Sequence, residues 1–351
     1  MQGLDSSVPA RALIVSDAWH PQINGVVRTL EWMIKEAPKF GIDLSVLGPS
    51  RFRTVAMPGY PEIRLALANP RSIRRAIRSE QPQAIHIATE GPLGTIARQF
   101  CLKHRLGFTT SYHTRFPEYL AARLPVPQRL SYAHMRRFHN AATACMVATP
   151  SLEDELQAKG FRNLVRWSRG VDLEQYYPRP SVKLPYPGPI FSYVGRVAVE
   201  KNLEAFLDLD LPGTKLVVGG GPALESLKAA YKDCVFVGPK LGEELAEYYS
   251  GSDVFVFPSL TDTFGIVLLE ALASGVPVAA FPVTGPKDVI TDPNVGALSY
   301  DLKAAALAAL ELKRDDCAAF AQQHSWHHSA KAFFTHLYPL KADWSVPNYD
   351  H

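Results

Sequence analysis

The sequence predicts an α/β protein of two domains, each built from a parallel sheet with helices between its strands. The chain of 351 residues and 38.7 kDa is longer than a single domain usually is. Short β-branched runs alternate with helical patterns from one end to the other, as in parallel sheets with crossover helices. A proline-rich stretch at 176–189 interrupts this alternation once and is typical of a linker, because proline resists regular structure. Two Rossmann-like domains are therefore expected.

The first half contains six expected strands. They lie at residues 12–16, 43–47, 84–87, 108–112, 144–148 and 164–168. One of the intervening helices has readable ends, because Ser151 is placed to cap its first turn and Gly160 to stop it. Acidic residues at 153–155 favour the positive end of the same helix.

The second half repeats the pattern. Its expected strands lie at residues 190–194, 215–218, 234–237, 254–257 and 278–280. Residues 324–337 predict a final amphipathic helix. The predicted division is an acceptor-binding domain at 1–175, a nucleotide-sugar-binding domain at 190–323, and a helix and tail at 324–351. Ligands of parallel sheets bind beyond the carboxyl ends of the strands, so a site is expected in those loops and in a cleft between the domains.

Composition excludes several other classes of protein. Hydrophobic residues make up 47% of the chain and charged residues 20%, which argues against a disordered or fibrous chain. The four cysteines form no CxxC pair, so neither a disulfide framework nor a structural zinc site is expected, and a reducing, cytoplasmic setting fits. No secretory signal is expected at the start.

The apolar stretch 264–283 contains Glu270 and Pro277, both costly in lipid, and predicts a buried helix followed by a buried strand.

Charge is distributed unevenly along the chain. Residues 1–172 contain 23 Lys and Arg against 13 Asp and Glu, whereas the remainder contains 14 against 21. The first half is therefore expected to prefer an anionic partner such as a membrane surface, a nucleic acid or a phosphorylated acceptor. The alternative is a solvated, arginine-rich surface.

Four loops after expected strands carry residues suited to a phosphorylated ligand. Asn24 and Gly25 form a turn before a helix, whose first N–H groups can bind an anion, although a plain connecting loop is the alternative. Arg196 and Lys201 follow the first strand of the second half and could neutralise a pyrophosphate, or form a surface pair. Three consecutive glycines at 219–221 allow close backbone approach to a ligand. They match neither the dinucleotide GxGxxG nor the P-loop GxxxxGK pattern, which disfavours dehydrogenases, kinases and ATPases.

The fourth loop is the most informative. It begins the segment PSLTDTFGIVLLEALASG at 258–275, where Asp262 follows a strand and Glu270 lies eight residues later on a helix. The helix start can bind phosphate, and the two carboxylates can accept hydrogen bonds from sugar hydroxyls. A buried Glu270 needs a polar partner, because an unpaired buried charge costs several kcal/mol.

These segments together resemble the retaining glycosyltransferases of family 4, which have the GT-B fold. The matching stretches run through both halves and read PQINGVVRTL, SYHTRFPEY, SRGVDLEQYYP, GRVAVEKN and PSLTDTFGIVLLEALASGVPV. Within the family the chain is similar to the bacterial and plant branch that forms glycolipids. The resemblance implies two Rossmann-like domains facing a central cleft, with the C-terminal helix crossing back to the first domain.

The resemblance also implies a role for each matching residue. Arg196 and Lys201 clamp the donor diphosphate, Asp262 and His113 contact the sugar, and Glu270 holds the ribose hydroxyls as the second acid of an EX7E motif. The implied donor-binding residues are Asn24, Gly25, Gly221, Thr263, Phe264, Gly265, Ile266, Val267 and Glu270. The anomeric configuration is retained by a front-face displacement, in which the leaving phosphate helps to deprotonate the acceptor hydroxyl. No cofactor is implied, and the donor is a nucleotide-diphosphate sugar, a UDP-sugar such as UDP-glucose or UDP-glucuronate in preference to GDP-mannose.

The chain departs from the family pattern at two positions, and a third carries a separate hypothesis. Asp262 stands where the family often has Glu, and Gly220 replaces an acid common in the family's GDGP motif, so that loop contributes shape alone. Lys287 follows another expected strand, and we expect it to favour an acidic sugar such as glucuronate; an unchanged glucose-to-glucuronate preference in Lys287→Ala would contradict this.

Two motifs suggest a metal site, but neither is favoured. The DxD sequence at 208–210 precedes a proline at an expected helix end, and His324, His327 and His328 lack ligand spacing. No metal is therefore expected.

The acceptor is expected to be a lipid such as diacylglycerol. Residues 123–140 combine apolar side chains with Arg129, Arg136 and Arg137, as in a basic amphipathic helix on an anionic membrane, and residues 69–80 add a second arginine-rich segment. The alternative is a helix whose apolar face packs into the core. The expected enzyme is cytoplasmic and associates peripherally with the inner face of the membrane.

Three other functions remain open from the sequence. A mannosyltransferase that uses GDP-mannose and a soluble saccharide or other acceptor would share every donor residue. A sugar-nucleotide epimerase of similar fold would act without an acceptor. A nucleic-acid-binding protein would explain the basic first half, but no helix-turn-helix, RRM or zinc pattern supports it, so no nucleic-acid partner is predicted.

Overall fold

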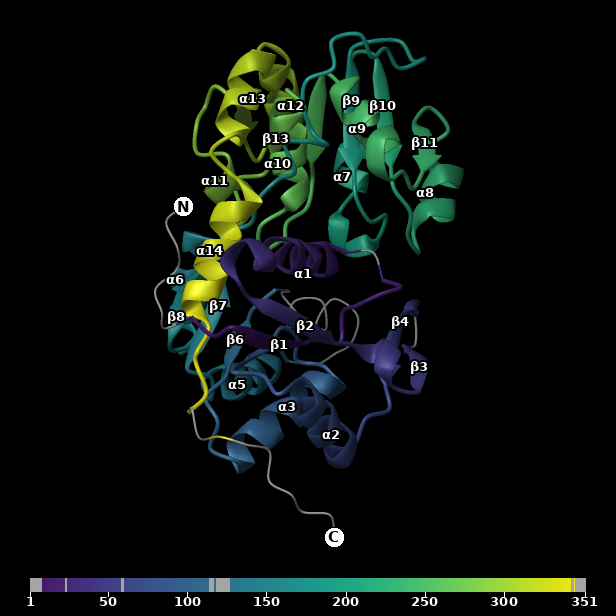
Figure 1. Cartoon of the computed structure of the whole chain (residues 1–351). Helices are drawn as coiled ribbons and strands as arrows, with labels where there is room; N and C mark the ends of the chain where they lie inside the picture. The colour runs from purple at the N-terminus through teal and green to yellow at the C-terminus, as the bar shows by residue number, and fades with distance from the viewer. Residues whose placement is uncertain are drawn as a thin grey trace. The chain divides into compact units, whose positions relative to one another are not determined.

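The computed structural model divides the chain into two compact units. It describes residues 8–22, 24–57, 60–113, 117, 127–341 and 344. Unit 1 contains Met1–Ser168 and Trp326–His351, and unit 2 contains Arg169–Ser325. Each unit is a parallel sheet covered by helices, as the sequence predicts (Figure 1).

The sheet of unit 1 has six parallel strands in the order β2-β1-β5-β6-β7-β8. They are β1 (Arg11–Val15), β2 (Asp43–Leu47), β5 (Ala84–Ile87), β6 (Thr109–Ser111), β7 (Ala144–Val147) and β8 (Leu164–Arg166). The six strands expected in the first half are thus confirmed to within two residues. An antiparallel pair, β3 (Thr54–Met57) and β4 (Tyr60–Ala66), was not expected.

Helices cover both faces of this sheet. They are α1 (Gly25–Glu36), η1 (Ala37–Phe40), η2 (Pro49–Arg51), α2 (Pro70–Glu80), α3 (Pro92–Lys103), α5 (Gln128–His139), α6 (Pro150–Ala158) and α14 (Trp326–His336). Side chains alternate along each strand, so Ile85 and Ile87 pack with α2 and α3 in one core. His86 points to the other face and contacts Phe333 of α14, and α14 packs beside α1 through stacked rings of Trp32 and Trp326 (Figure 1).

The start of α6 differs from the sequence-based prediction. The cap is Thr149, whose hydroxyl accepts a hydrogen bond from the backbone N–H of Leu152, and Ser151 already lies inside the helix. Pro150 explains the earlier start, because its fixed φ suits the first helical position. Gly160 follows the helix with φ +83°, as a stop signal should.

Unit 2 has a second parallel sheet in the order β11-β10-β9-β12-β13-β14. Its strands are β9 (Ile190–Val194), β10 (Thr214–Val218), β11 (Val235–Gly238), β12 (Val254–Phe257), β13 (Val278–Ala280) and β14 (Gly296–Leu298). Five of these strands were expected, and β14 was not.

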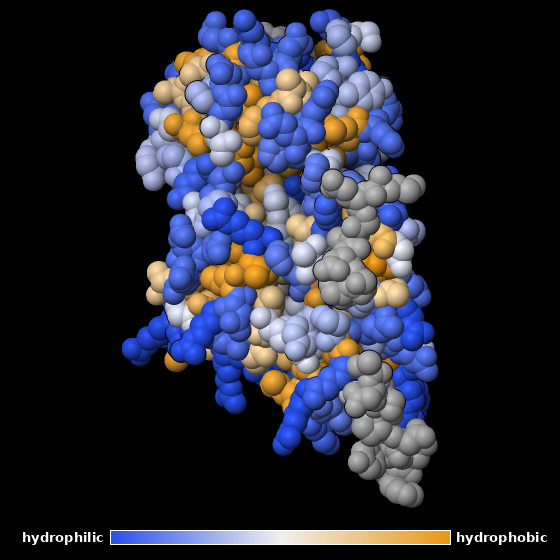
Figure 2. Space-filling view, turned by 60° about the vertical axis from the view of Figure 1, so that its left-hand side comes forward, coloured by the Kyte–Doolittle hydropathy of each residue, from blue (hydrophilic) through white to orange (hydrophobic). Residues whose placement is uncertain are grey.

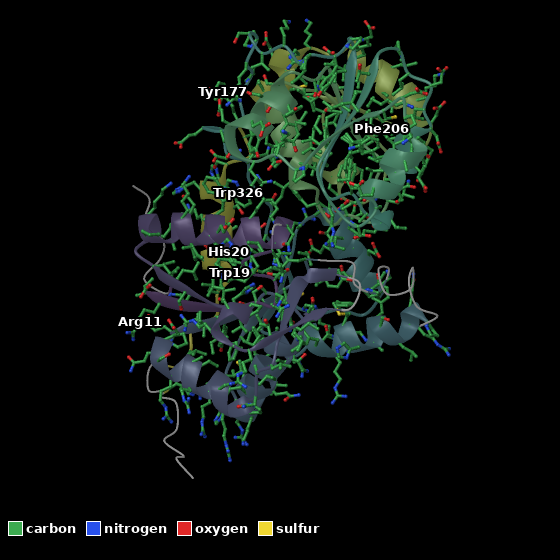
Figure 3. The ribbon with its side chains drawn as sticks, turned by 90° about the vertical axis from the view of Figure 1, so that its right-hand side faces the viewer. Arg11, Trp19, His20, Tyr177, Phe206 and Trp326 are labelled. Atoms are coloured by element: carbon green, nitrogen blue, oxygen red, sulfur yellow. The ribbon has the colours of Figure 1, made fainter. Side chains whose placement is uncertain are left out.

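The helices of unit 2 also lie on both faces of the sheet. They are η3 (Val199–Lys201), α7 (Glu204–Leu207), α8 (Leu224–Ala230), α9 (Gly242–Ser250), α10 (Ile266–Ala273), α11 (Pro286–Val289), α12 (Leu302–Leu310) and α13 (Arg314–Ala321). Phe206 of α7 lies inside one core together with α8 and α12 (Figure 3). On α10 and β13, the buried helix and buried strand expected within 264–283 are confirmed.

The face of the molecule that Figure 2 shows is mainly hydrophilic. In Figure 2, apolar side chains reach the surface as several separate areas among hydrophilic ones. Among the described helices, none combines the length and the apolar character that crossing a bilayer requires.

Candidate active site

The sheet order of unit 2 defines where a ligand site is expected. The strand after β9 in sequence, β10, lies on one side of it, whereas β12 lies on the other side. In open parallel sheets, ligands bind at such a switch point, outside the carboxyl ends of the two central strands. The loop after β9 carries Arg196 and Lys201, and the loop after β12 carries Asp262. The structure therefore places all three predicted residues at one edge of the sheet.

An ion pair joins these two loops. The Lys201 ammonium lies 2.6 Å from Asp262 Oδ1 and 2.9 Å from Oδ2. The Asn202 side-chain amide donates to the Pro258 carbonyl at 3.1 Å and adds a second link. Both charged side chains are more than four-fifths buried, at 19% and 16% exposure. The pair therefore holds an ammonium and a carboxylate in fixed positions at the switch point.

The Arg196 backbone is also held in place. The hydroxyl of Tyr193 donates to the Arg196 carbonyl at 2.9 Å. The Arg196 side chain is half-buried and begins five residues before Lys201. Two cationic side chains therefore come from the same loop. The resemblance implies this arrangement for binding a diphosphate.

Two glycines of the 219–221 loop, Gly219 and Gly221, lie close to the chain's own backbone. A Cβ on Gly219 would lie 1.8 Å from the Gly195 carbonyl oxygen, and one on Gly221 would lie 2.2 Å from the Val197 carbonyl oxygen. Their φ angles are +150° and +156°. These glycines are thus required because the loop packs against the backbone after β9, and close approach to a ligand is not needed to explain them. The contact of Gly221 with a donor stays a prediction.

The helix after Asp262, α10, directly follows a glycine and carries a buried acid. Gly265 precedes α10 with φ +82°, and the first N–H groups of a helix have no acceptor within it. Glu270 is 1% exposed, and its Oε2 accepts a hydrogen bond from the Tyr249 hydroxyl at 2.9 Å. The expectation that Glu270 has a polar partner is confirmed. Tyr249 itself was not expected, because nothing in its surroundings in the sequence marks it.

The other residues predicted at this edge surround the start of α10. Phe264 is buried, whereas Thr263, Ile266 and Val267 are half-buried. Lys287 lies on α11 and is exposed. Gly285, which precedes α11, lies so close to residues 262–264 that a Cβ would meet the Asp262 and Phe264 carbonyl oxygens at 3.2 Å. Their contacts with a donor stay predictions.

In unit 1, the predicted residues follow β1 and β6. The Asn24 side-chain oxygen accepts from the N–H groups of Val26 and Val27, so it caps α1, and Gly25 is exposed at the first position of that helix. His113 follows β6 and is half-buried, with its ring 5.7 Å from that of Trp167. Residue 23 and residues 114–116 of the matching motifs lie outside the described part of the chain.

The loops after β1 and β5 carry a polar cluster that the sequence analysis missed. Asp17 accepts hydrogen bonds from the N–H groups of Leu93 and Gly94 at the start of α3, and from the Thr89 hydroxyl. Burial raises the pKa of this carboxyl above its ordinary value, although those hydrogen bonds oppose the rise. After Asp17 come Trp19 and His20, whose rings meet edge to face at 4.8 Å (Figure 3).

A buried histidine is paired with an acid beside this cluster. His139 Nε2 lies 3.0 Å from Glu90 Oε1, and its Nδ1 lies 3.0 Å from the Thr110 hydroxyl. Burial alone would lower the pKa of His139, but the neighbouring Cys145 and the Glu90 carboxylate favour the imidazolium and raise the pKa to about 10. The contact with Glu90 therefore favours the charged form of His139.

This charge makes a prediction about stability. A pKa raised on folding stabilises the protein fully below the unfolded value of about 6.5, and the contribution is lost as the pH rises through the folded value. We expect the difference in free energy of unfolding between the wild type and His139→Gln to be largest near pH 6 and to shrink towards pH 10. Urea denaturation at several pH values measures it. His134→Gln, an exposed position of the same helix, is the control. A difference that does not change with pH would refute the assignment.

The two motifs that suggested a metal have other partners. Asp208 accepts from the Tyr231 hydroxyl, and Asp210 pairs with Lys303 at 2.9 Å. His327 lies 3.1 Å from Glu36, a carboxylate partner that the sequence did not reveal. Within the residues that the structure describes, no group of three or more His, Cys, Asp or Glu side chains could hold a metal ion.

The basic helix α5 uses its apolar face inside unit 1. Tyr132, Met135 and Phe138 are buried in the core. For these three residues the structure therefore agrees with the alternative prediction, a helix whose apolar face packs into the core. Packing against the sheet buries the apolar surface that would contact a membrane. Arg129, Arg136 and Arg137 are exposed, and their attraction to a membrane stays a prediction. Residues 123–126 lie outside the described ranges.

Two family models match the chain, one in each half. The model described as "Glycosyltransferase Family 4" matches residues 23–175, and the model described as "Glycosyl transferases group 1" matches residues 188–315. These matches identify the protein as a glycosyltransferase. The chain belongs to glycosyltransferase family 4.

Individual relatives differ in the activity that their names state. A GDP-mannose-dependent alpha-mannosyltransferase of Mycobacterium tuberculosis is 30% identical, over 82% of this chain and 83% of its own length. The sulfoquinovosyl transferase SQD2 of Arabidopsis thaliana is 31% identical, over 71% of this chain and 52% of its own length. An alpha-monoglucosyldiacylglycerol synthase of Streptococcus pneumoniae is 25% identical, over 95% and 86%.

Solved structures share the fold at low sequence identity. Sucrose-phosphate synthase of Thermosynechococcus elongatus has a TM-score of 0.74 at 19% identity, covering 93% of this chain and 97% of the other. Anabaena HepE, solved with UDP and glucose, has a TM-score of 0.68 at 13% identity, covering 92% and 98%. Both are GT-B proteins, so the predicted fold class is confirmed.

Proposed function

We propose that the chain is a retaining glycosyltransferase that moves a hexose from a nucleotide-diphosphate sugar to the hydroxyl of a lipid acceptor. The observation that carries this proposal is the Lys201–Asp262 pair at the switch point of unit 2. An ammonium and a carboxylate fixed together suit a ligand that presents phosphate beside sugar hydroxyls. The helix start at α10 adds N–H groups for the same phosphates.

The proposed reaction needs stabilisation of the leaving group above all. The bond between the anomeric carbon and the diphosphate oxygen breaks while the acceptor oxygen bonds to the same carbon on the same face. The acceptor proton passes to the departing phosphate, so charge on the diphosphate is what the protein must stabilise. Lys201 supplies a point charge and Arg196 a planar fork. Glu270, fixed by Tyr249, accepts hydrogen bonds from the ribose hydroxyls.

Two donors are supported by different observations. UDP-glucose or UDP-glucuronate is supported by the resemblance to the glycolipid-forming branch and by the UDP and glucose in the HepE structure. GDP-mannose is supported by the relative of Mycobacterium tuberculosis, whose name states that donor. GDP-mannose-dependent transfer, to a soluble saccharide or another acceptor, is therefore the second candidate function.

The lipid acceptor and its membrane are supported by charge and by two relatives. Arg129, Arg136 and Arg137 are exposed on unit 1, whose sequence carries the positive excess. Two of the relatives have names that state glycolipid synthesis or sulfoquinovosyl transfer. The proposed location is the cytoplasmic face of a membrane, to which the protein attaches peripherally.

Turnover with separate donors tests the proposal. UDP-glucose, UDP-glucuronate and GDP-mannose are each supplied with diacylglycerol vesicles, with a soluble mannoside, and with no acceptor, and both nucleotide release and glycosylated product are measured. A glycolipid with the donor's anomeric configuration, formed only with vesicles, is the expected result. Product from GDP-mannose and the soluble mannoside alone would establish the second candidate, and absence of product from all nine combinations would refute both.

A further inference from the structure

Unit 1 contains a pair, Glu90 and His139, that no predicted donor contact includes. His139 has a fully buried side chain, and Glu90 is 18% exposed. They are joined by the 3.0 Å contact between Nε2 and Oε1, and Thr110 fixes the other ring nitrogen. Nothing in the proposed donor chemistry uses this pair, although burying two ionised groups is costly unless they are paired.

The position of Glu90 in the sheet is that of a ligand residue. In unit 1, β2 lies on one side of β1 and β5 lies on the other, so the switch point is between β1 and β5. Glu90 is in the loop after β5, and Asp17 is in the loop after β1. The Asp17 carboxylate bonds to Thr89 and to the start of α3, so these two loops meet. By the same rule that places Lys201 and Asp262, this edge is where unit 1 binds a ligand.

The chemistry of this edge excludes an anionic ligand group at this point. Asp17 occupies the N–H groups at the start of α3, where a phosphate would otherwise bind. Glu90 adds a second carboxylate close enough to raise the pKa of Asp17. A phosphate or carboxylate ligand would meet the Glu90 carboxylate and would find the N–H groups at the start of α3 already bound to Asp17.

One oxygen of Glu90 is available to a ligand. Oε1 is held by His139, whereas no described residue donates a hydrogen bond to Oε2. An ionised carboxylate only accepts hydrogen bonds, so its ligand must donate one. An uncharged hydroxyl fits this requirement, and the contact is charge-assisted.

We propose that Glu90 binds a hydroxyl group of the acceptor substrate and that His139 is the residue that positions it. The acceptor is thus an uncharged polyol at this point of contact, either the glycerol part of a lipid or a sugar. This inference rests on the proposed function and adds the substrate class that unit 1 recognises.

Glu90→Gln is the variant that tests the inference. Glutamine has the same shape and can still accept from His139, but its NH₂ group replaces the oxygen that would accept from the acceptor. We expect KM for the acceptor to rise about 10- to 100-fold, as for the loss of a hydrogen bond to a charged group, with smaller changes in KM for the donor. Glu80→Gln is the matched control, because Glu80 is 20% exposed and pairs with Arg51 in the same unit.

Deoxy acceptors and His139→Gln complete the test. An acceptor that lacks the bound hydroxyl should lose affinity for the wild type but not for Glu90→Gln. His139→Gln should raise KM for the acceptor by a smaller factor, and the KM of this variant should depend on pH less than that of the wild type. Diacylglycerol and a soluble mannoside, tested separately, distinguish the two sources of the hydroxyl.

The outcomes separate the inference from the proposed function. If the wild type is active and Glu90→Gln leaves the KM for the acceptor unchanged, the inference is wrong but the proposed function stands. If the variant does not fold, the deoxy acceptors decide with the wild type: equal KM for every deoxy acceptor overturns the inference. A wild type that transfers from no donor to any acceptor overturns the proposed function and the inference with it.

Discussion

Lys201→Met is expected to lower kcat for glycosyl transfer by about 10²- to 10³-fold, the loss seen when one preorganised charge donor is removed from an active site. Lys201 is held by Asp262 at 2.6 Å at the switch point of unit 2, where the diphosphate is proposed to bind. Methionine preserves most of the side-chain volume and removes only the charge. The measurement is initial rate at saturating donor, with the product analysed directly.

The same unit offers a matched control for this variant. Lys303 pairs with Asp210 at 2.9 Å on the surface, so Lys303→Met also removes a lysine from an ion pair. We expect its kcat to stay within about twofold of the wild type, since exposed pairs contribute little. Equal rates for Lys201→Met and Lys303→Met would show that Lys201 has no part in the reaction.

Gly219→Ala is expected to destabilise unit 2 by about 3–5 kcal/mol. The new Cβ would lie 1.8 Å from the Gly195 carbonyl oxygen, so either β10 or the loop after β9 must move. The φ of +150° adds backbone strain that a residue with a Cβ does not tolerate. Each effect costs about 1–3 kcal/mol in other proteins. Urea denaturation followed by tryptophan fluorescence and circular dichroism measures the loss.

The neighbouring glycine is the control. A Cβ on Gly220 would meet its nearest atom, in Pro239, at 3.6 Å, which is ordinary van der Waals contact. Gly220→Ala is therefore expected to change the free energy of unfolding by less than about 1 kcal/mol. If both alanine variants unfold at the same urea concentration, the packing role assigned to Gly219 is wrong.

Periodicity and strand chemistry predicted most of the fold. The short apolar runs that form β1, β9 and β12 each contain two β-branched residues and are recognisable without any structure. The strand β14 was missed because its three residues, Gly296–Leu298, include two small ones and resemble a loop. The β3–β4 pair was missed although a Pro-Gly pair at 58–59, a turn signal, separates its two strands in the sequence.

The candidate site was predictable in part. Arg196, Lys201 and Asp262 each follow a strand, so the sequence could place them at a ligand-binding edge. Their pairing could not be predicted, because Lys201 and Asp262 are 61 residues apart and meet only through the order of strands in the sheet.

The residues that the sequence analysis missed have partners on distant segments. His139 lies in a basic helix and looks like a surface residue until Glu90, 49 residues away, is placed beside it. Tyr249 likewise meets Glu270 from another helix. The glycine run at 219–221 was expected to allow close backbone approach. In the structure, the backbone after β9 lies close to Gly219 and Gly221.

Titration calorimetry with UDP and with GDP tests most directly whether the switch point of unit 2 binds the diphosphate of a nucleotide sugar. We expect at least one of the two nucleotides to bind the wild type with a stoichiometry of one. Lys201→Met should bind it at least tenfold more weakly, and Lys303→Met as tightly as the wild type. Absence of binding for both nucleotides, or equal affinity of the wild type and Lys201→Met, would contradict the account.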